Sequence, residues 1–110
     1  MTQHPITLEI YITTKGTKPF ADWLNRLPDI KTRAIIRARL NRIRLGNFGD
    51  CRSVGNGVHE FRIDYGPGYR IYFGRVALNV VLLLCAGTKG SQLKDIERAR
   101  QYWEEYMEES

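Results

Sequence analysis

The chain has 110 residues, 43% hydrophobic and 26% charged, with a net charge of +5, which fits one soluble globular domain spanning residues 1–110. Its longest apolar run, Val80 to Ala86, is too short to cross a bilayer, and no secretory signal is evident, so we expect a cytoplasmic protein without membrane contact. Cys51 and Cys85 lack the spacing of a metal site, and Cys85 lies in an apolar run where a buried thiol is expected.

The basic charge lies in the body of the chain. All seventeen Lys and Arg fall within residues 1–100, together with eight acids, whereas the last ten residues hold four Glu and no base. Twelve of the bases are Arg, whose planar guanidinium binds phosphate through paired hydrogen bonds. This composition fits either an anionic polymer as partner or a basic surface that is merely solvated.

The chain begins with a predicted strand and a predicted helix. Apolar and polar residues alternate from Thr7 to Ile12, which predicts a strand with one apolar face, and Gly16 ends it. Pro19 lies near the first turn of a helix whose apolar residues recur at helical spacing, and Pro28 ends this helix.

A second helix is predicted from the cap residue Asp29 to about Leu45. Its apolar residues fall into two stripes, which predicts contact with both a sheet and the neighbouring helix. The two helices should form a hairpin on a sheet, and the stripes are Ile36/Leu40/Ile43 and Ile30/Ala34/Ala38.

The C-terminal half predicts three strands and a helix. Val58–Asp64 and Tyr69–Arg75 alternate and flank a Gly-Pro-Gly turn, while Asn79–Ala86 is almost wholly apolar, as for a central strand covered on both faces. A helix from Gln92 to about Met107 follows. The predicted fold class is α+β, with an N-terminal strand, a helical hairpin, a three-stranded antiparallel meander that completes one sheet, and a C-terminal helix.

Strand parity assigns side chains of the meander to two faces. Arg62 and Arg70 are expected on one face, with Glu60 beside them, while His59 falls on the opposite, apolar face as a packed histidine. Tyr69 is likewise expected in the core.

Two stretches carry a family resemblance, GNGVHEFRIDYGPGYRIYF and VVLLLCAGTKGSQLKDIERA. The specific signals are Arg62 before the turn, Gly68-Tyr69-Arg70 after it, Gly87-Thr88-Lys89, and then Gln92 and Asp95-Ile96. They resemble the RelE/ParE toxin superfamily, and most closely its phage-derived group of addiction module killer proteins, or HigB-like toxins. With the matching order of elements, the resemblance covers nearly the whole chain.

The resemblance implies the toxin of a type II toxin–antitoxin system, acting as a ribosome-dependent mRNA endonuclease (an mRNA interferase) that needs neither metal nor cofactor. In such enzymes the ribose 2′-hydroxyl attacks the adjacent phosphate, and basic side chains of the sheet stabilise the added charge. Arg70 matches the arginine that follows Gly-Tyr in this family, Lys89 the basic residues after the last strand, and Arg62 the strand that carries their lysines.

The sequence does not assign the general base and the general acid of this reaction. Arginine stays protonated and cannot be the base. Glu60 is either a base or an ion-pair partner of an arginine, and Lys89 becomes a base only if neighbouring cations lower its pKa. His59 has a suitable ordinary pKa for a base, about 6.5, but alternation places it on the face away from Arg62. RelE also uses a C-terminal tyrosine, and here no tyrosine follows Lys89 before Tyr102.

Further residues are candidates for RNA binding. Tyr65 and Tyr72 could stack on bases, and Arg37 and Arg44 on the second helix could hold phosphates or form a solvated face. The acidic C-terminal helix could pair with such basic rows.

Two other functions compete with the nuclease. One is a non-catalytic gyrase poison of the ParE kind, and the other is a nucleic-acid-binding module without catalysis. If the protein is a toxin of either kind, the resemblance implies a cognate antitoxin, expected to be a helix-turn-helix DNA-binding protein. Operator DNA is then expected to be bound only through the toxin–antitoxin complex.

Overall fold

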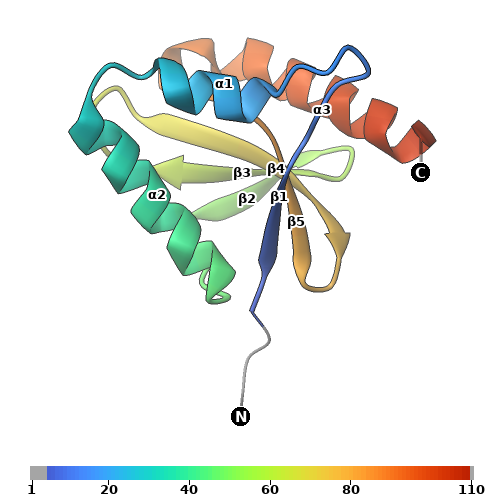
Figure 1. The fold of residues 1–110 in the computed structure, drawn as a ribbon, viewed down its shortest axis with the longest axis horizontal. Helices are drawn as coiled ribbons and strands as arrows, with labels where there is room; N and C mark the ends of the chain where they lie inside the picture. Colours follow the sequence, from blue (N-terminus) through green and yellow to red (C-terminus); the bar gives the residue numbers. More distant parts are fainter. Residues whose placement is uncertain (1–4, 110) are drawn as a thin grey trace.

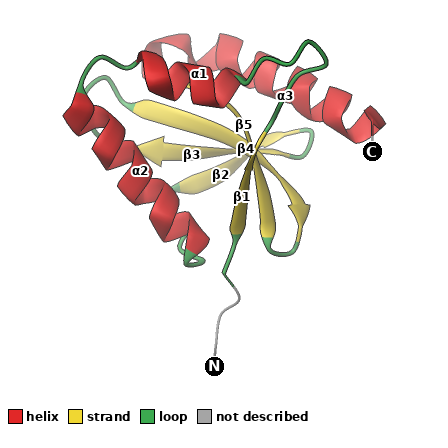
Figure 2. Cartoon of the chain, in the orientation of Figure 1, coloured by secondary structure: helices red, strands yellow, loops and turns green. Residues whose placement is uncertain are grey.

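A computed structural model describes residues 5–109, in which three helices surround one sheet (Figure 1). The element order is β1 (Thr7–Ile10), α1 (Pro19–Arg26), α2 (Ile30–Arg44), β2 (Cys51–Gly55), β3 (Val58–Ile63), β4 (Tyr69–Ala77), β5 (Val80–Thr88), the 3-10 turn η1 (Lys89–Ser91) and α3 (Gln92–Glu109). The α+β class is therefore confirmed, and the helices and strands of Figure 2 follow the predicted sequence of elements with one addition.

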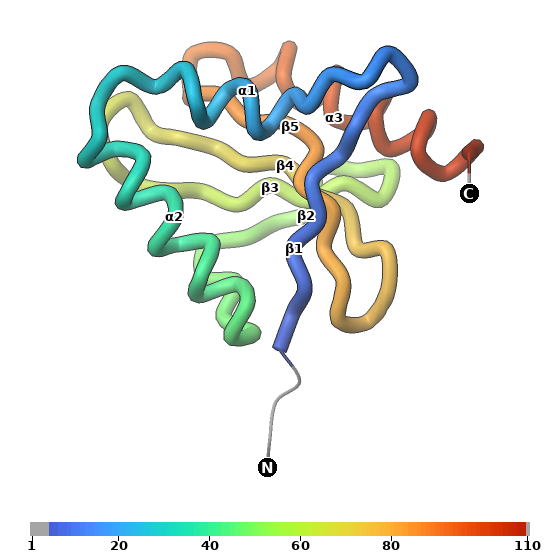
Figure 3. The backbone as a smooth tube through the Cα atoms, in the orientation of Figure 1, coloured from blue at the N-terminus to red at the C-terminus, as the bar shows by residue number. Residues whose placement is uncertain are grey.

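The five strands form a mixed sheet in the order β1-β5-β4-β3-β2. Strands β2 to β5 form an antiparallel meander, whereas β1 pairs in parallel with β5, so the first and last strands of the chain lie side by side (Figure 3). The prediction of three meander strands was wrong by one, because β2 was not foreseen.

A two-residue turn joins β2 to β3. Gly55 pairs with Val58, and the residues between them, Asn56 and Gly57, have φ of 57° and 85°. Positive φ at both central positions is the geometry of a type I′ turn, for which Asn-Gly is the favoured sequence. The Asn-Gly pair therefore indicates a hairpin, and with it the strand β2 that was not predicted.

The sheet is covered on both faces. One face packs on α1 and α2 around a core that includes Phe20, Leu24, Ile36, Leu40, Ile43, Phe61, Ile63, Ile71, Phe73 and Leu83. The other face packs on α3 through Tyr11, Val54, Val58, Tyr72, Leu82, Leu84 and Ala99. Because α2 and α3 lie on opposite faces of the sheet, the acidic helix α3 does not pair with the basic rows of α2, which include Arg37 and Arg44. The suggestion that they pair was wrong.

Only one of the two predicted stripes of α2 is buried. Ile36, Leu40 and Ile43 are buried, while Ile30 is 74% exposed and the rest of its stripe, Ala34 and Ala38, is exposed as well. The second stripe therefore contacts no neighbouring helix, and that prediction was wrong.

Strand β5 is buried from Val81 to Ala86, which confirms a central strand covered on both faces. Cys85 is a buried free thiol as expected, and burial followed by the nearby charge of Asp95 raises its pKa to about 12. Within residues 5–109, none of the helices has the length and apolar character needed to span a bilayer.

Candidate functional site

The β3–β4 hairpin places the two predicted arginines directly opposite each other. Arg62 pairs with Arg70 in the strand register, and Glu60 pairs with Tyr72 two residues further along. These residues share one face of the sheet, as parity predicted, and it is the face that α3 covers, since Tyr72 packs in the α3 core. The start of α3 reaches this cluster, because Gln92 donates a hydrogen bond to Glu60.

Arg62, Arg70 and Lys89 meet at one hollow of about 330 Å³, here called the arginine hollow. It lies where the β3–β4 turn meets η1, and the backbone N–H of Lys89 donates to the carbonyl of Gly68 at 2.8 Å. Its lining is Asp50, Arg62, Ile63, Asp64, Gly68, Tyr69, Arg70 and Lys89. The three predicted cations are thus brought together, beside two carboxylates, and can bind an anion such as phosphate.

Glu60 lies behind the arginines with its side chain fully buried. Its Oε1 accepts from Arg52 Nε at 3.0 Å, and its Oε2 accepts from Tyr72 Oη at 3.1 Å and from Gln92 Nε2 at 2.9 Å. Burial alone would raise the pKa of this carboxyl, but the hydrogen bonds from Gln92, Arg52 and Tyr72 outweigh it and hold the pKa below its usual range. Glu60 is therefore an ionised carboxylate that accepts three hydrogen bonds.

The arginines of the hollow are held by the charge of Glu60. Arg62 Nε lies 3.7 Å from Glu60 Oε1, and Arg70 Nε lies 3.6 Å from Oε2, distances of ion pairs rather than hydrogen bonds. The Arg70 side chain is only 10% exposed, and the Nε atoms of both arginines are buried without a hydrogen-bond partner. A nearly buried guanidinium such as that of Arg70 is costly for folding unless its charge is balanced, so a bound anion in the hollow would stabilise it.

The geometry favours one of the two roles left open for Glu60. A buried carboxylate with a lowered pKa and three hydrogen bonds is a poor proton acceptor, so the geometry favours the ion-pair partner over the base. Glu60 positions the arginines from behind the hollow and does not line it.

The RNA-stacking role predicted for Tyr72 was wrong. Its side chain is fully buried in the α3 core, and its hydroxyl donates to Glu60, so no base can reach the ring. Burial, followed by the charge of Glu60 and this hydrogen bond, raises the pKa of Tyr72 far above its ordinary value. Parity placed Tyr72 on the arginine face correctly but could not show that α3 covers it.

His59 lies on the opposite face, as predicted. Its ring stacks on Phe73 with the centroids 5.4 Å apart, and it is partly buried. Burial, and then the charge of Arg75, lowers the pKa of His59. It is a packed histidine outside the arginine hollow.

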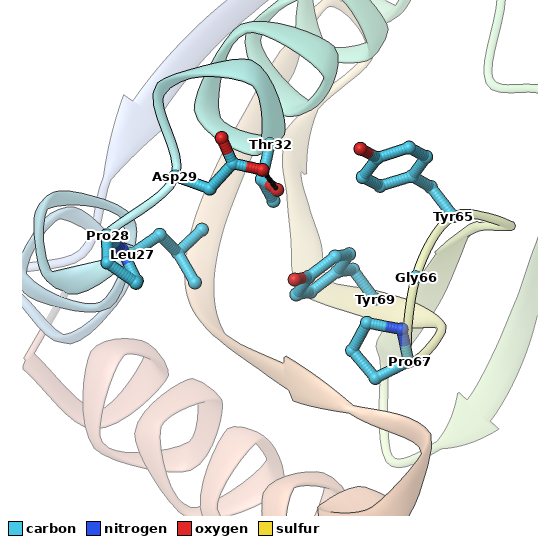
Figure 4. Close-up of a pocket in the computed structure, with 8 residues that line it drawn as sticks. All are labelled: Leu27, Pro28, Asp29, Thr32, Tyr65, Gly66, Pro67 and Tyr69. Carbon is cyan, nitrogen blue, oxygen red and sulfur yellow. Dashed lines mark hydrogen bonds between the residues drawn. The ribbon is translucent and has the colours of Figure 1, made fainter.

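The other candidate RNA-binding residues are dispersed. Tyr65 is half-buried and lines a second hollow beside the β3–β4 turn (Figure 4). Arg37 and Arg44 are exposed on α2 and flank a different depression, lined mostly by apolar residues of β1, α1 and α2. The helix α2 packs on the face of the sheet opposite to Arg70, so these two arginines do not join the arginine hollow.

Sequence reasoning missed Arg52 and Asp50 as parts of this cluster. Arg52 lies on the unforeseen strand β2, opposite Glu60, and Asp50 immediately before β2 lies 3.8 Å from Arg62 Nε. The Asn-Gly turn would have disclosed β2 and, by register, the place of Arg52. Gln92 was noted as part of the family resemblance, but its bond to Glu60 depends on the packing of α3.

Comparison with known proteins gives one informative match. A protein of Haemophilus influenzae (strain ATCC 51907 / DSM 11121 / KW20 / Rd), described as an uncharacterized protein, is 45% identical over 89 residues, which is 81% of this chain and 90% of the relative. The two chains belong to one family. No protein-family model matches the chain, and no solved structure matches it.

Proposed function

We propose that the protein is the toxin of a type II toxin–antitoxin system, cytoplasmic, and that it cleaves mRNA on the ribosome as a RelE/ParE-type endonuclease. The observation that carries the proposal is the arginine hollow, in which Arg62, Arg70 and Lys89 converge in front of a buried, ionised Glu60. Cations that are fixed before the substrate arrives can stabilise the charge that develops on a phosphate during attack by a 2′-hydroxyl. Its expected partners are a cognate helix-turn-helix antitoxin and mRNA, with operator DNA bound through the antitoxin.

Each residue of the arginine hollow has a distinct role in the proposed cleavage. Arg70, the most buried cation of the hollow, binds the scissile phosphate, and Arg62 and Lys89 neutralise its remaining oxygens. Glu60 holds the two arginines in position. Lys89, exposed at the rim of the hollow, is the candidate for the base.

One observation favours a second function. Glu60 lies behind the hollow with its carboxylate held by three hydrogen bonds, and His59 lies on the other face of the sheet, so neither is well placed to accept a proton there. A hollow that binds an anion without proton transfer fits a non-catalytic ParE-like gyrase poison.

The two functions are separated by inducible expression without antitoxin and mapping of mRNA 5′ ends. We expect cuts phased with codons, and Arg70→Ala should reduce cleavage by about a hundredfold or more, as when a preorganised charge donor is removed. Arg26→Ala is the matched control, because Arg26 is an exposed arginine at the end of α1 that does not line the arginine hollow, and its cutting pattern should not change. Growth arrest with intact mRNA and accumulated gyrase-linked DNA breaks would establish the poison instead.

A further inference from the structure

A second hollow, here called the tyrosine pocket, lies at the same end of the sheet as the arginine hollow. It measures about 470 Å³ and is open to solvent between the α1–α2 corner and the β3–β4 turn. Figure 4 shows Leu27, Pro28, Asp29 and Thr32 along one wall and Tyr65, Gly66, Pro67 and Tyr69 along the other. Tyr69 lines both hollows, and the tip of the turn separates them.

The two hollows differ in charge. The arginine hollow is lined by three cations and two carboxylates, whereas the tyrosine pocket is lined by no cation and by a single carboxylate, that of Asp29. A carboxylate repels phosphate, while phenol rings and proline offer flat apolar surface to a planar ring. The pocket therefore suits an uncharged aromatic ligand with hydrogen-bond donors on its edge.

The walls of the pocket are held in place before any ligand binds. The Tyr69 ring packs edge-on against Trp23, with the centroids 5.9 Å apart. The Tyr65 carbonyl accepts from the N–H of Gly68 at 3.0 Å, which closes the turn beneath the Tyr65 ring. A preformed stacking surface loses little conformational entropy on binding.

Asp29 is fixed as an acceptor. Its Oδ1 accepts from the Lys31 N–H at 3.0 Å. Its Oδ2 accepts from the Thr32 hydroxyl at 2.9 Å, the hydrogen bond marked in Figure 4. The Thr32 hydrogen bond and then that of Lys31 lower the pKa of Asp29, so it is ionised at neutral pH. Each carboxylate oxygen has a further lone pair, and the pair can accept two parallel hydrogen bonds.

We propose that the tyrosine pocket binds the base of a nucleotide whose phosphate lies in the arginine hollow, and that Asp29 makes guanine the preferred base. This inference rests on the proposed function, because it takes RNA as the ligand. Guanine presents a ring N–H and an amino group side by side, which matches the two oxygens of a carboxylate, whereas uracil flanks its single N–H with two carbonyl oxygens. Tyr65 supplies the stacking surface, the role predicted for it from the sequence.

The test is a titration of the full-length protein with GMP, UMP and inorganic phosphate, followed by backbone-amide NMR. We expect inorganic phosphate to shift the signals of Arg62, Arg70 and Lys89, and GMP to shift those of Tyr65 and Asp29 as well. GMP should bind about tenfold more tightly than inorganic phosphate, because stacking of one base contributes a binding free energy toward the lower end of its usual range. Should GMP shift the same signals as phosphate and no others, the pocket takes no base and the inference fails.

Two variants test the roles of the walls. Tyr65→Ala should weaken GMP about tenfold and leave inorganic phosphate unchanged. Asp29→Asn keeps a good helix cap but removes the charge and adds an N–H donor, so the preference for GMP over UMP should disappear. Ile30→Ala is the matched control, since Ile30 begins the same helix, is 74% exposed and does not line the pocket. An unchanged GMP preference in Asp29→Asn would overturn the role of Asp29.

The outcomes distinguish this inference from the proposed function. If mRNA is cut but Tyr65→Ala and Asp29→Asn alter neither nucleotide binding nor the bases at the cut sites, the subsite is wrong and the nuclease stands. If mRNA stays intact yet GMP binds through Tyr65 and Asp29, the subsite stands and the nuclease is wrong.

Discussion

The two faces of the sheet bury different kinds of side chain. Toward α1 and α2 the buried core is built of aliphatic and aromatic residues. Toward α3 one part is equally apolar, but the other part buries Glu60, Arg70 and Asp95. Buried ion pairs commonly stabilise a fold less than apolar residues of similar volume would. The charged part of the α3 face is therefore expected to stabilise the fold less per residue than the apolar remainder of both faces, and it is the part that the proposed function uses.

The largest effect should come from removing the charge on which the cluster depends. Glu60→Ala leaves Arg70 as an almost wholly buried cation without its counter-charge. We expect a loss of about 3 kcal/mol in the free energy of unfolding, the lower end for a broken buried pair, because Arg52 and Arg62 are about half exposed and can be solvated. Chemical denaturation measures it, with Glu97→Ala on the exposed side of α3 as control. A change as small as the control's would mean that the cluster is solvated and that the two faces do not differ.

The apolar part of the α3 face should respond to added volume. A methyl group on Gly74 would overlap the Trp103 ring, which packs directly on this glycine. Gly74→Ala should therefore lower the free energy of unfolding by about 1–3 kcal/mol, and by less in a Trp103→Ala background, where the ring is gone. Gly90→Ala is the control, because a methyl group there meets only ordinary contact with Thr88. Equal losses in both backgrounds would show that Trp103 does not set the size limit at Gly74.

The smallest effect is a dependence of stability on pH. The pKa of Glu60 is lowered in the folded protein, so its stabilising contribution is complete above the unfolded pKa of about 4.3 and is lost as the pH falls below it. Melting temperatures measured between neutral and acidic pH should fall less steeply in Glu60→Gln than in the native protein. If the melting temperatures of the two proteins fall in parallel with pH, the acid sensitivity belongs to other carboxylates. Glu60 would then not account for an electrostatic difference between the two faces.

Local patterns predicted most of the elements. Alternation found β3 and β4, the apolar run found β5, and Asp29 was correctly taken as the cap of α2, where its side chain accepts from Lys31. Strand β2 was missed because its residues, CRSVG, neither alternate clearly nor form an apolar run, although the Asn-Gly turn after it was visible.

The site was predictable only in part. Parity placed Arg62 and Arg70 on one face, and the register confirms it. It could not show that α3 buries Tyr72 or that Arg52 reaches Glu60, because both depend on which elements pack over that face. Arg37 and Arg44 were chosen for charge alone, and charge along a helix does not tell which side of a sheet the helix covers.

The parallel pairing of β1 with β5 has a consequence for how the chain assembles. Thr7 is matched with Val80, so the partner of the first strand is synthesised only after most of the chain. Bringing such distant segments together carries a large loop-closure entropy, and contacts of this kind form slowly. On the ribosome the strand β1 therefore stays without its partner until β5 has been synthesised, and only then can the sheet reach its full width.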